Sequence, residues 1–481
     1  LSYSLSNGKG EPISPAYLIG SIRSLYPKLE IEGGAGVRPH KNSINNYCYP
    51  ENPEAGIDLF LEKLVQETEK EHEDILEQAD ETDAMFGELY SWYLRNPEYR
   101  SRVQKLVQSA FAGKPKDIIS QSVAKALYGE VSPYSATRLE RFAACAFAHF
   151  LQYGMKLTER VEYEFKPMDM GNVMHEALES FAEEVRKRGM KWTELTEQER
   201  NEIADRCLDN IVADYGNTVL KSSARNEYMI ERTRRILRRT VWALQKQLEQ
   251  GEFQPEGFEV TFGGGRIDRV DIMEDQNKVY VKVIDYKTGN TSFDLVYLYH
   301  GLQLQLMIYL DGALRVEQKK YPDKEIIPAG VFYYNIKDPM IQEKIDADVK
   351  AVSAGLMKEL KMNGLVQADP ELVYRMDSSL GSIPVAFNKD GSFRKNSSVA
   401  DRTQFAVLGR YVRTKIEKIR SSILEGDAEV SPYELGKKNA CTYCPYMTVC
   451  GFDRRLSGYE FRRLKNFSDE ELWKAFDREA E

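Results

Sequence analysis

The pattern of apolar and polar positions is most regular in residues 263–289, GGGRIDRVDIMEDQNKVYVKVIDYKTG. On either side of the polar stretch 275–278, apolar residues recur at every second position, which is typical of half-buried strands. The segment therefore predicts a β-hairpin with its turn at the Gln276–Asn277 bond. A hairpin that is symmetric about this bond places Asp268 directly opposite Asp285.

These two opposed carboxylates are the first sign of chemistry in the hairpin. Directly opposed residues have Cβ atoms about 4.5–5.5 Å apart, where like charges destabilise a sheet, so a bound divalent cation is the expected compensation. Lys287 lies two positions beyond Asp285 and projects from the same face. An aspartate followed by Asp-x-Lys is typical of metal-dependent nucleases, although this triplet alone fits a surface hairpin with scattered charges better. The register and the further candidate residues favour the nuclease site.

The pattern divides the chain into two regions. After a loop-rich opening, residues up to about 112 are mainly helical, and the sequence Ala112-Gly113-Lys114-Pro115 suggests a boundary. No GxxxxGK[ST] phosphate loop occurs in the sequence, so it shows no ATP-hydrolysing motor of its own. We assign residues 1–120 to a mostly helical domain, residues 121–470 to a second domain and residues 471–481 to a C-terminal tail.

Helical and strand patterns alternate in the second region, which predicts an α/β fold. A helix near residue 140 is expected to begin with a capping box, Thr137-x-x-Glu140. A strand at 258–262 leads into the hairpin, a helix begins near Leu295, and another strand follows at 327–336.

Three polar side chains on these helices are candidates for the same site. His175 follows Gly171 by four positions on one helical face, and glycine allows a close approach of the backbone to a ligand. Gln305 and Tyr309 stand one turn apart, where they are suited to orienting a scissile phosphate or its attacking water. Each also has an ordinary explanation, because a lone helical histidine is usually structural and polar groups occur in protein interiors.

Composition narrows the class of protein. A chain of 481 residues with 42% hydrophobic and 11% aromatic residues is globular, and it has neither an apolar run of membrane-spanning length nor a signal peptide, so we expect a cytoplasmic protein. It begins at Leu1, which suggests a fragment of a longer protein. The net charge of −9 argues against a surface coated for nucleic acid. Residues 225–246 form the one basic helical stretch, which fits a solvated amphipathic helix and a phosphate track equally well.

The cysteines suggest a second metal site. Cys441-x2-Cys444-x5-Cys450 places three thiols in ten residues, a spacing unlike a secreted disulfide framework. Zinc and a four-iron four-sulfur cluster both commonly take four cysteines, and spacing alone does not separate them. Cys145 is the candidate for the fourth ligand, because Cys48 and Cys207 lie in segments with no other sign of a site. Such a centre would join the two ends of the second domain.

With these residues assembled, the sequence resembles the C-terminal nuclease region of the AddB family, which forms part of bacterial AddAB helicase-nucleases. The resemblance rests on RLERFAACAFAHFLQYG, MGNVMHE, GRIDRVD, VIDYKTG, GLQLQLMIYLDGA and CTYCPYMTVCGF, an ordered set between Arg138 and Phe452. It implies a RecB-type nuclease of the PD-(D/E)XK class, with a restriction-endonuclease-like core in which helices flank a mixed sheet. Residues 1–120 match less distinctly and correspond to the end of the family's helicase-like part.

The resemblance also implies roles for individual residues. The Mg²⁺ or Mn²⁺ ligands would be His175, Asp268 and Asp285. Lys287 would orient or activate the attacking water, and Gln305 and Tyr309 match the family's Q-x-x-x-Y motif. The ligands of a 4Fe-4S cluster would be Cys145, Cys441, Cys444 and Cys450, which favours iron over zinc. Ala146 departs from the family, where proline often follows the first cysteine, and this change leaves ligation intact.

The expected partners follow from the same resemblance. An AddA-type helicase-nuclease subunit would supply the ATP-driven motor, and single-stranded DNA would enter the nuclease, which would trim the 5′-ended strand during break repair. Two alternatives remain open. One is a non-catalytic DNA-binding scaffold with a dead nuclease fold and a zinc site, and the other is a stand-alone single-strand exonuclease.

Overall fold

A computed structural model describes residues 17–28, 53–69, 81–110, 118–129, 135–158, 167–214, 223–263, 265–341, 349–456 and 458–480. The chain divides into two compact units, Leu1–Ala112 and Gly113–Glu481. The predicted boundary at residues 112–115 lies outside the described residues, so the limits of the domains stay predictions.

The first unit is helical in its described parts, as the sequence predicts. Its helices are α1 (Tyr17–Leu25), α2 (Pro53–Glu69), α3 (Glu81–Arg95) and α4 (Pro97–Ala110). A small core holds α2, α3 and α4 together around Phe60 and Tyr93, whose side chains are fully buried. The hydroxyl of Tyr93 donates a hydrogen bond to the carbonyl oxygen of Pro53 at 2.6 Å. This unit therefore has a core of its own.

The second unit is built around a six-stranded mixed sheet in the order β1-β2-β3-β4-β5-β6. The strands are β1 (Gln254–Phe262), β2 (Gly265–Glu274), β3 (Lys278–Lys287), β4 (Glu325–Asn335), β5 (Asn363–Gln367) and β6 (Val399–Ala400). Strands β1, β2 and β3 are successively antiparallel, β3 and β4 are parallel, β4 and β5 antiparallel, and β5 and β6 parallel. The predicted α/β fold with a mixed sheet is confirmed.

The register of the β2–β3 hairpin is the one that the apolar alternation predicts. Arg269 pairs with Ile284, and the ladder continues to the pair of Glu274 and Val279 next to the turn. One step beyond Arg269, the same register places Asp268 opposite Asp285. The alternation of apolar residues therefore determined which side chains face each other, because a shift of the strand register by one residue would move every side chain of that strand to the other face of the sheet.

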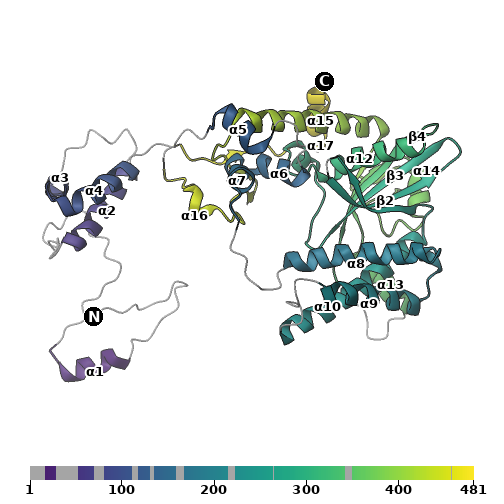
Figure 1. Cartoon of the computed structure of the whole chain (residues 1–481), viewed down its shortest axis with the longest axis horizontal. Coiled ribbons are helices and arrows are strands. Elements are labelled where there is room, and N and C mark those ends of the chain that lie inside the picture. The colour runs from purple at the N-terminus through teal and green to yellow at the C-terminus, as the bar shows by residue number, and fades with distance from the viewer. Residues whose placement is uncertain are drawn as a thin grey trace. The chain divides into compact units, whose positions relative to one another are not determined.

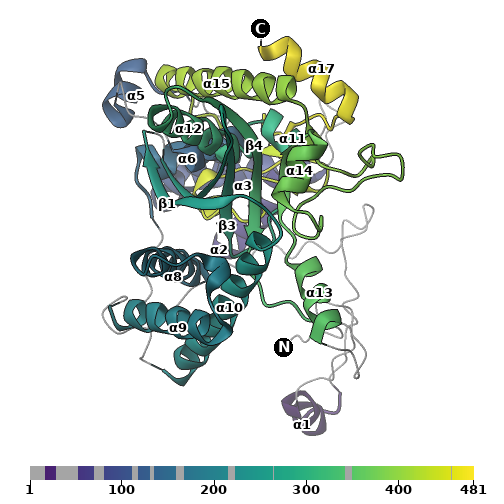
Figure 2. The same ribbon diagram turned by 90° about the vertical axis from the view of Figure 1, so that its right-hand side faces the viewer.

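Helices cover both faces of this sheet (Figure 2). Helices α12 (Gln305–Lys320) and α15 (Arg402–Glu425) lie on one face, and α8 (Pro167–Lys187), α9 (Glu197–Asp214) and α10 (Ala224–Leu248) lie on the other (Figure 1). Along β3, Val279, Val281 and Val283 contribute to the core shared with α12 and α15, whereas Ile284 and Tyr286 contribute to the core shared with α8–α10. The alternation of β3 thus serves two separate cores.

The remaining described elements complete the second unit. They are α5 (Gln121–Tyr128), α6 (Ala136–Ala144), α7 (Ala146–His149), η3 (Phe150–Gly154), η4 (Trp192–Glu194), α11 (Leu295–Tyr299), α13 (Val349–Glu359), α14 (Pro370–Met376), β7 (Tyr433–Leu435), β8 (Lys438–Asn439), α16 (Met447–Cys450), β9 (Arg462–Arg463) and α17 (Asp469–Ala480). The single helix predicted from Leu295 is wrong: α11 ends at Tyr299 and α12 begins at Gln305. Gly301 lies between them with a φ of 77°, a left-handed conformation that interrupts a helix.

The two ends of the second unit meet. The backbone N–H of Phe147 donates to the carbonyl oxygen of Glu429 at 3.0 Å, and the hydroxyl of Tyr446 donates to the carbonyl oxygen of Leu157 at 3.0 Å. The described part of the predicted C-terminal tail, residues 471–480, lies in α17, which packs against α15 and buries Phe476. None of the helices in the described ranges combines the length and the apolar character that a membrane span requires.

A buried ion network pins β2 to β3 next to the hairpin's carboxylates. Arg269 donates to Asp271 at 2.5 and 2.9 Å, and Lys282 on the neighbouring strand lies 3.0 Å from the same carboxylate. Burial raises the pKa of Asp271, but the charges of Arg269 and Lys282 outweigh it, so its pKa lies below the ordinary value. Asp271 is therefore a neutralised, structural aspartate.

We expect Gly364→Ala in β5 to destabilise the second unit by about 1–3 kcal/mol or more, because an added Cβ would lie 1.9 Å from the carbonyl oxygen of Val331. Gly409→Ala in α15 is the matched control, since nothing lies within 4 Å of its added Cβ. That change should stabilise the protein by about 0.5–1 kcal/mol through helix propensity. Urea unfolding of both variants measures the two effects, and equal midpoints would contradict the close β4–β5 approach.

Candidate active site

Helix α8 brings His175 to the end of the β2–β3 hairpin. The close approach depends on Gly171, one turn earlier, because a Cβ at that position would lie 3.3 Å from the hydroxyl oxygen of Thr288 just beyond β3. The Nδ1 atom of His175 lies 3.3 Å from Oδ2 of Asp268. The pairing of Gly171 with His175 in the sequence therefore reflects helix-to-sheet packing at the site.

Asp268 occupies the centre of a row of acidic residues. Its Oδ2 atom accepts a hydrogen bond from the backbone N–H of Tyr286 at 2.7 Å, which fixes the carboxylate against β3. The β1–β2 register pairs Phe258 with Arg269 and Val260 with Ile267, so that Glu259 lies opposite Asp268. Asp268 thus has an acidic residue on each neighbouring strand.

Glu259 is the site residue that sequence reasoning missed. Its side chain is only 6% exposed, and its Oε1 atom lies 3.8 Å from Nδ1 of His175. Its backbone has a φ of 49°, which is uncommon for a residue other than glycine and costs energy unless the surroundings enforce it. Ligand atoms of His175, Glu259 and Asp268 all lie within 4.8 Å of one another, a spacing that suits one metal ion.

The pKa values at the site reflect this concentration of negative charge. Burial, followed by the charge of Asp268, raises the pKa of Asp285 to about 7, although Lys287 and His175 oppose the rise. Burial lowers the pKa of His175, but hydrogen bonds to Asp268 and Glu259 outweigh it and raise the value to about 10. The site therefore attracts positive charge strongly.

Lys287 connects the carboxylates to α12. Its Nζ atom lies 2.6 Å from Oδ2 of Asp285 and donates a hydrogen bond to Oε1 of Gln305 at 2.8 Å. The amide of Gln305 donates in turn to the hydroxyl oxygen of Tyr309 at 2.9 Å. Burial raises the pKa of Tyr309 to about 12, so this hydroxyl stays protonated at neutral pH. The structure therefore brings the predicted Gln305 and Tyr309 together with the predicted lysine.

The four predicted cysteine ligands also gather at one place. Cys145, at the junction of α6 and α7, shares a small core with Tyr446, and Cys444 packs against that core. Burial and the neighbouring thiols of Cys145, Cys444 and Cys450 raise the pKa of Cys441 to about 11. The Cys441 thiol would therefore ionise readily only beside a cation. Cys207 is buried elsewhere, between the helices of the other core, and Cys48 lies outside the described residues.

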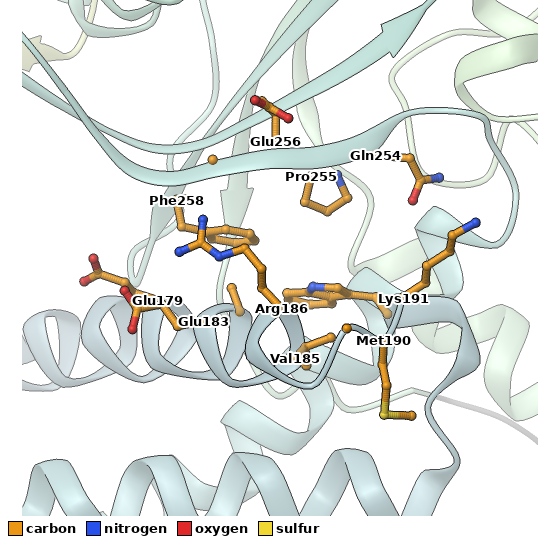
Figure 3. A pocket seen from close by; sticks show the side chains of 14 residues that line it. Glu179, Glu183, Val185, Arg186, Met190, Lys191, Gln254, Pro255, Glu256 and Phe258 are labelled. Carbon is orange, nitrogen blue, oxygen red and sulfur yellow. The ribbon is translucent and has the colours of Figure 1, made fainter.

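A cleft of about 290 Å³ lies beside the site, between β1 and the C-terminal end of α8 (Figure 3). Phe258 and Pro255 face Arg186 and Lys191 across it. It contains none of the predicted site residues, although Phe258 directly precedes Glu259 in the chain. The cleft is therefore a neighbour of the acidic cluster and not its centre.

The arginines of α10 are largely occupied. Arg234 lies 2.7 Å from Asp209, Arg235 donates to Asp338 at 2.6 Å, and Arg238 pairs with Asp205. Of the two explanations for this basic stretch, the amphipathic helix paired with its neighbours accounts for these contacts without any bound phosphate.

The sequence profile of the PD-(D/E)XK nuclease superfamily matches residues 133–451, a range that contains the cysteine site, the acidic cluster and the whole sheet. The chain belongs to the PD-(D/E)XK nuclease superfamily. Nucleases of this superfamily generally use divalent metals, which agrees with the acidic cluster of this nuclease domain.

Curated relatives of this nuclease-superfamily chain are named as the B subunit of an ATP-dependent helicase/deoxyribonuclease. The protein from Lachnoclostridium phytofermentans is 38% identical over 503 residues, those from Alkaliphilus metalliredigens and a Thermoanaerobacter species are 32% and 30% identical, and each match covers 100% of this chain. The chain spans only 42–43% of the length of these relatives. The resemblance to AddB is confirmed for this part of the family.

We expect Glu259→Gln to weaken Mn²⁺ binding at least about tenfold, because it removes one charged ligand atom. The measurement is the rise in melting temperature with added Mn²⁺, which reports binding to the folded state. Glu256→Gln is the matched control on the same strand, since Glu256 pairs with Lys320 instead. A variant at Glu259 that responds to Mn²⁺ like wild type would show that this carboxylate does not bind the ion.

Proposed function

We propose that this chain is the nuclease part of a DNA-processing complex and hydrolyses phosphodiester bonds of single-stranded DNA with Mg²⁺ or Mn²⁺. The observation that supports this most directly is the row of acidic residues facing His175 and Lys287 at the end of the hairpin. Three ligand atoms within 4.8 Å of one another fit a single divalent ion. Burial raises the pKa of the neighbouring Asp285, which lies 2.6 Å from Lys287, to about 7, and a bound ion would favour the charged form of this carboxyl.

The residues proposed to hold the ion are His175, Asp268 and Asp285, with Glu259 as an additional ligand. A bound divalent ion would polarise the scissile phosphate and lower the pKa of a bound water. Oxygen-rich sites with one histidine suit Mg²⁺ and Mn²⁺ better than soft metals. The buried Asp285 fits this use, because an ion would offset the charge that burial and Asp268 make costly.

The other side chains have roles that follow from their contacts. Lys287 supplies a positive charge beside Asp285, where it stabilises negative charge that develops on the phosphate in the transition state. Gln305 holds the ammonium of Lys287 through its amide oxygen, and Tyr309 holds the amide of Gln305. The two residues of the Q-x-x-x-Y motif thus act by orienting Lys287.

For the cysteine site we propose a 4Fe-4S cluster held by Cys145, Cys441, Cys444 and Cys450. Two observations support a bound group: the thiols come from both ends of the unit, and burial raises the pKa of Cys145 and of Cys441, so that the charged form of these two is costly without a cation. The choice of iron over zinc rests on the likeness to AddB sequences. Zinc in this site is the alternative, and it would accompany a non-catalytic scaffold.

The wider role is proposed from the names of the relatives. Like them, the protein would be one subunit of a complex and would work with an AddA-type helicase-nuclease that supplies ATP-driven unwinding. It would act on chromosomal DNA in the bacterial cytoplasm and degrade the 5′-ended strand as an exonuclease during repair of double-strand breaks by recombination. A stand-alone exonuclease is a weaker explanation, since these relatives carry the name of a subunit.

We expect the wild-type chain to degrade labelled single-stranded DNA in Mg²⁺ and not in chelator. Lys287→Ala should slow cleavage about a hundredfold or more, because it removes a charge needed in the transition state, while the Mn²⁺-dependent rise in melting temperature persists. Lys278→Ala at the exposed start of the same strand is the matched control and should cleave normally. Undiminished cleavage by both Lys287→Ala and Asp285→Ala would refute the site.

Cys444→Ser is expected to lose bound metal and to lower the unfolding temperature, because binding at a site shared by both ends of the unit is coupled to folding. Iron and zinc analysis, with the visible absorption of the purified protein, measures the first effect. Cys207→Ser should keep the metal content of wild type, since Cys207 lies in the other core. Zinc without iron in anaerobically purified wild type would favour the zinc alternative.

A further inference from the structure

Glu140 lies on α6, apart from the residues assigned to the nuclease site, and its carboxylate reaches the first turn of α12. Its Oε1 atom accepts hydrogen bonds from the backbone N–H groups of Leu304 at 2.7 Å and Gln305 at 2.9 Å. One oxygen atom of one side chain therefore joins two elements that are 164 positions apart in the chain.

The capping box predicted for Thr137 and Glu140 is wrong, and this frees Glu140 for another role. Helix α6 begins at Ala136, and its cap is Ser135, whose side chain accepts from the N–H of Arg138 at 3.4 Å. Glu140 lies on the second turn of α6, too far along the helix to cap it. The spacing in the sequence matched the motif, but the carboxylate caps a different helix.

Helix α12 begins without a capping side chain of its own. The first N–H groups of a helix have no partner within it, and the residue at the cap position is Leu304, which makes no side-chain cap hydrogen bond. Glu140 supplies the acceptor that serine or aspartate usually supplies at this position. Its negative charge also lies at the positive end of the helix dipole.

The capped residue carries a side chain of the proposed site. Gln305 is the first residue of α12, and its amide oxygen accepts the hydrogen bond from Nζ of Lys287 at 2.8 Å. Lys287 lies in turn 2.6 Å from Asp285. A shift of the first turn of α12 would therefore move the group that holds Lys287.

The surroundings of Glu140 make the burial of its charged carboxylate energetically unfavourable. Neighbouring residues of α6, Leu139 and Ala143, are buried in the core shared with α12. Burial raises the pKa of Glu140 to about 7, although the two backbone N–H groups and the charge of Lys287 oppose the rise. The carboxyl group next to α12 has thus lost hydration by water, and the two backbone N–H groups replace part of it.

We propose that Glu140 is a positioning residue of the nuclease, which places Lys287 by capping α12 and holding Gln305. The inference rests on the proposed function, because it needs Lys287 to act on the phosphate. Because one oxygen atom accepts both N–H hydrogen bonds, this capping requires an acceptor atom at a fixed distance from the backbone of α6. It does not require a negative charge.

Two conservative variants separate reach from charge. Glu140→Gln keeps an acceptor oxygen at the same reach and removes the charge, whereas Glu140→Asp keeps the charge and withdraws the oxygen by one methylene. In single-turnover cleavage of single-stranded DNA at saturating Mg²⁺, Glu140→Asp should be slower by about tenfold to a hundredfold, and Glu140→Gln should cleave at nearly the wild-type rate. The KM for DNA and the Mn²⁺-dependent rise in melting temperature should stay unchanged in both.

Amide hydrogen exchange tests the cap independently of nuclease activity. In Glu140→Asp, exchange should accelerate in the first turn of α12 and stay unchanged in its last turns, and in Glu140→Gln it should match wild type throughout. Gln303→Ala is the control within the same loop. The side chain of Gln303 binds the backbone at Asp294 and Ser292 and does not touch Glu140, so cleavage should persist in this variant.

The outcomes are distinct. Loss of cleavage in Glu140→Gln with normal cleavage in Glu140→Asp would show that the charge matters and would overturn the inference. Unchanged exchange at α12 in Glu140→Asp would overturn it as well. If wild type itself does not cleave DNA but exchange responds as expected, the proposed function fails while the capping of α12 by Glu140 is supported.

Discussion

Repulsion among carboxylates on adjacent strands is the constraint around which the second unit is arranged. Asp268 has Glu259 beside it on β1 and Asp285 beside it on β3, where like charges oppose sheet formation. His175 from α8, Lys287 from the hairpin itself and Arg266, which pairs with Glu259, offset this charge. Helices from both faces of the sheet therefore contribute side chains to one point, where a divalent ion would take over part of the role of these cations.

Two aspartates three positions apart show how surroundings decide between a structural and a chemical role. Asp271 is enclosed by Arg269 and Lys282, which neutralise it and lock the hairpin together. Among the described residues, Asp268 has no such enclosure: the contacts found there are one backbone N–H and a histidine that also faces Glu259. The buried network of Arg269, Asp271 and Lys282 next to it holds the carboxylates of the site in register, so the stable part of the hairpin supports the reactive part.

Contacts between residues close together in the sequence were predicted better than contacts between distant residues. The register of β2 and β3, from which the pairing of Asp268 with Asp285 follows, was predicted correctly because alternation and one short turn determine it. Glu259 was missed because its place opposite Asp268 depends on the pairing of a further strand, β1, where a register shift near Gly257 and the left-handed backbone of Glu259 itself break the simple alternation. The role of Glu140 was assigned wrongly because its partners on α12 are distant in sequence, and a local motif explained it equally well.

The arrangement of the thiols bears on how such a protein is made. Cys145 lies near the start of the second unit, whereas Cys441, Cys444 and Cys450 lie near its far end, with the whole sheet between them. A ribosome synthesises the chain from its N-terminus, so Cys145 is made well before the other three cysteines. All four thiols are present only after residue 450 has been added. A metal centre held by all four thiols could therefore form only in chains that were translated past residue 450. Shorter products would contain the complete hairpin, but the two ends of the unit would not be joined in them.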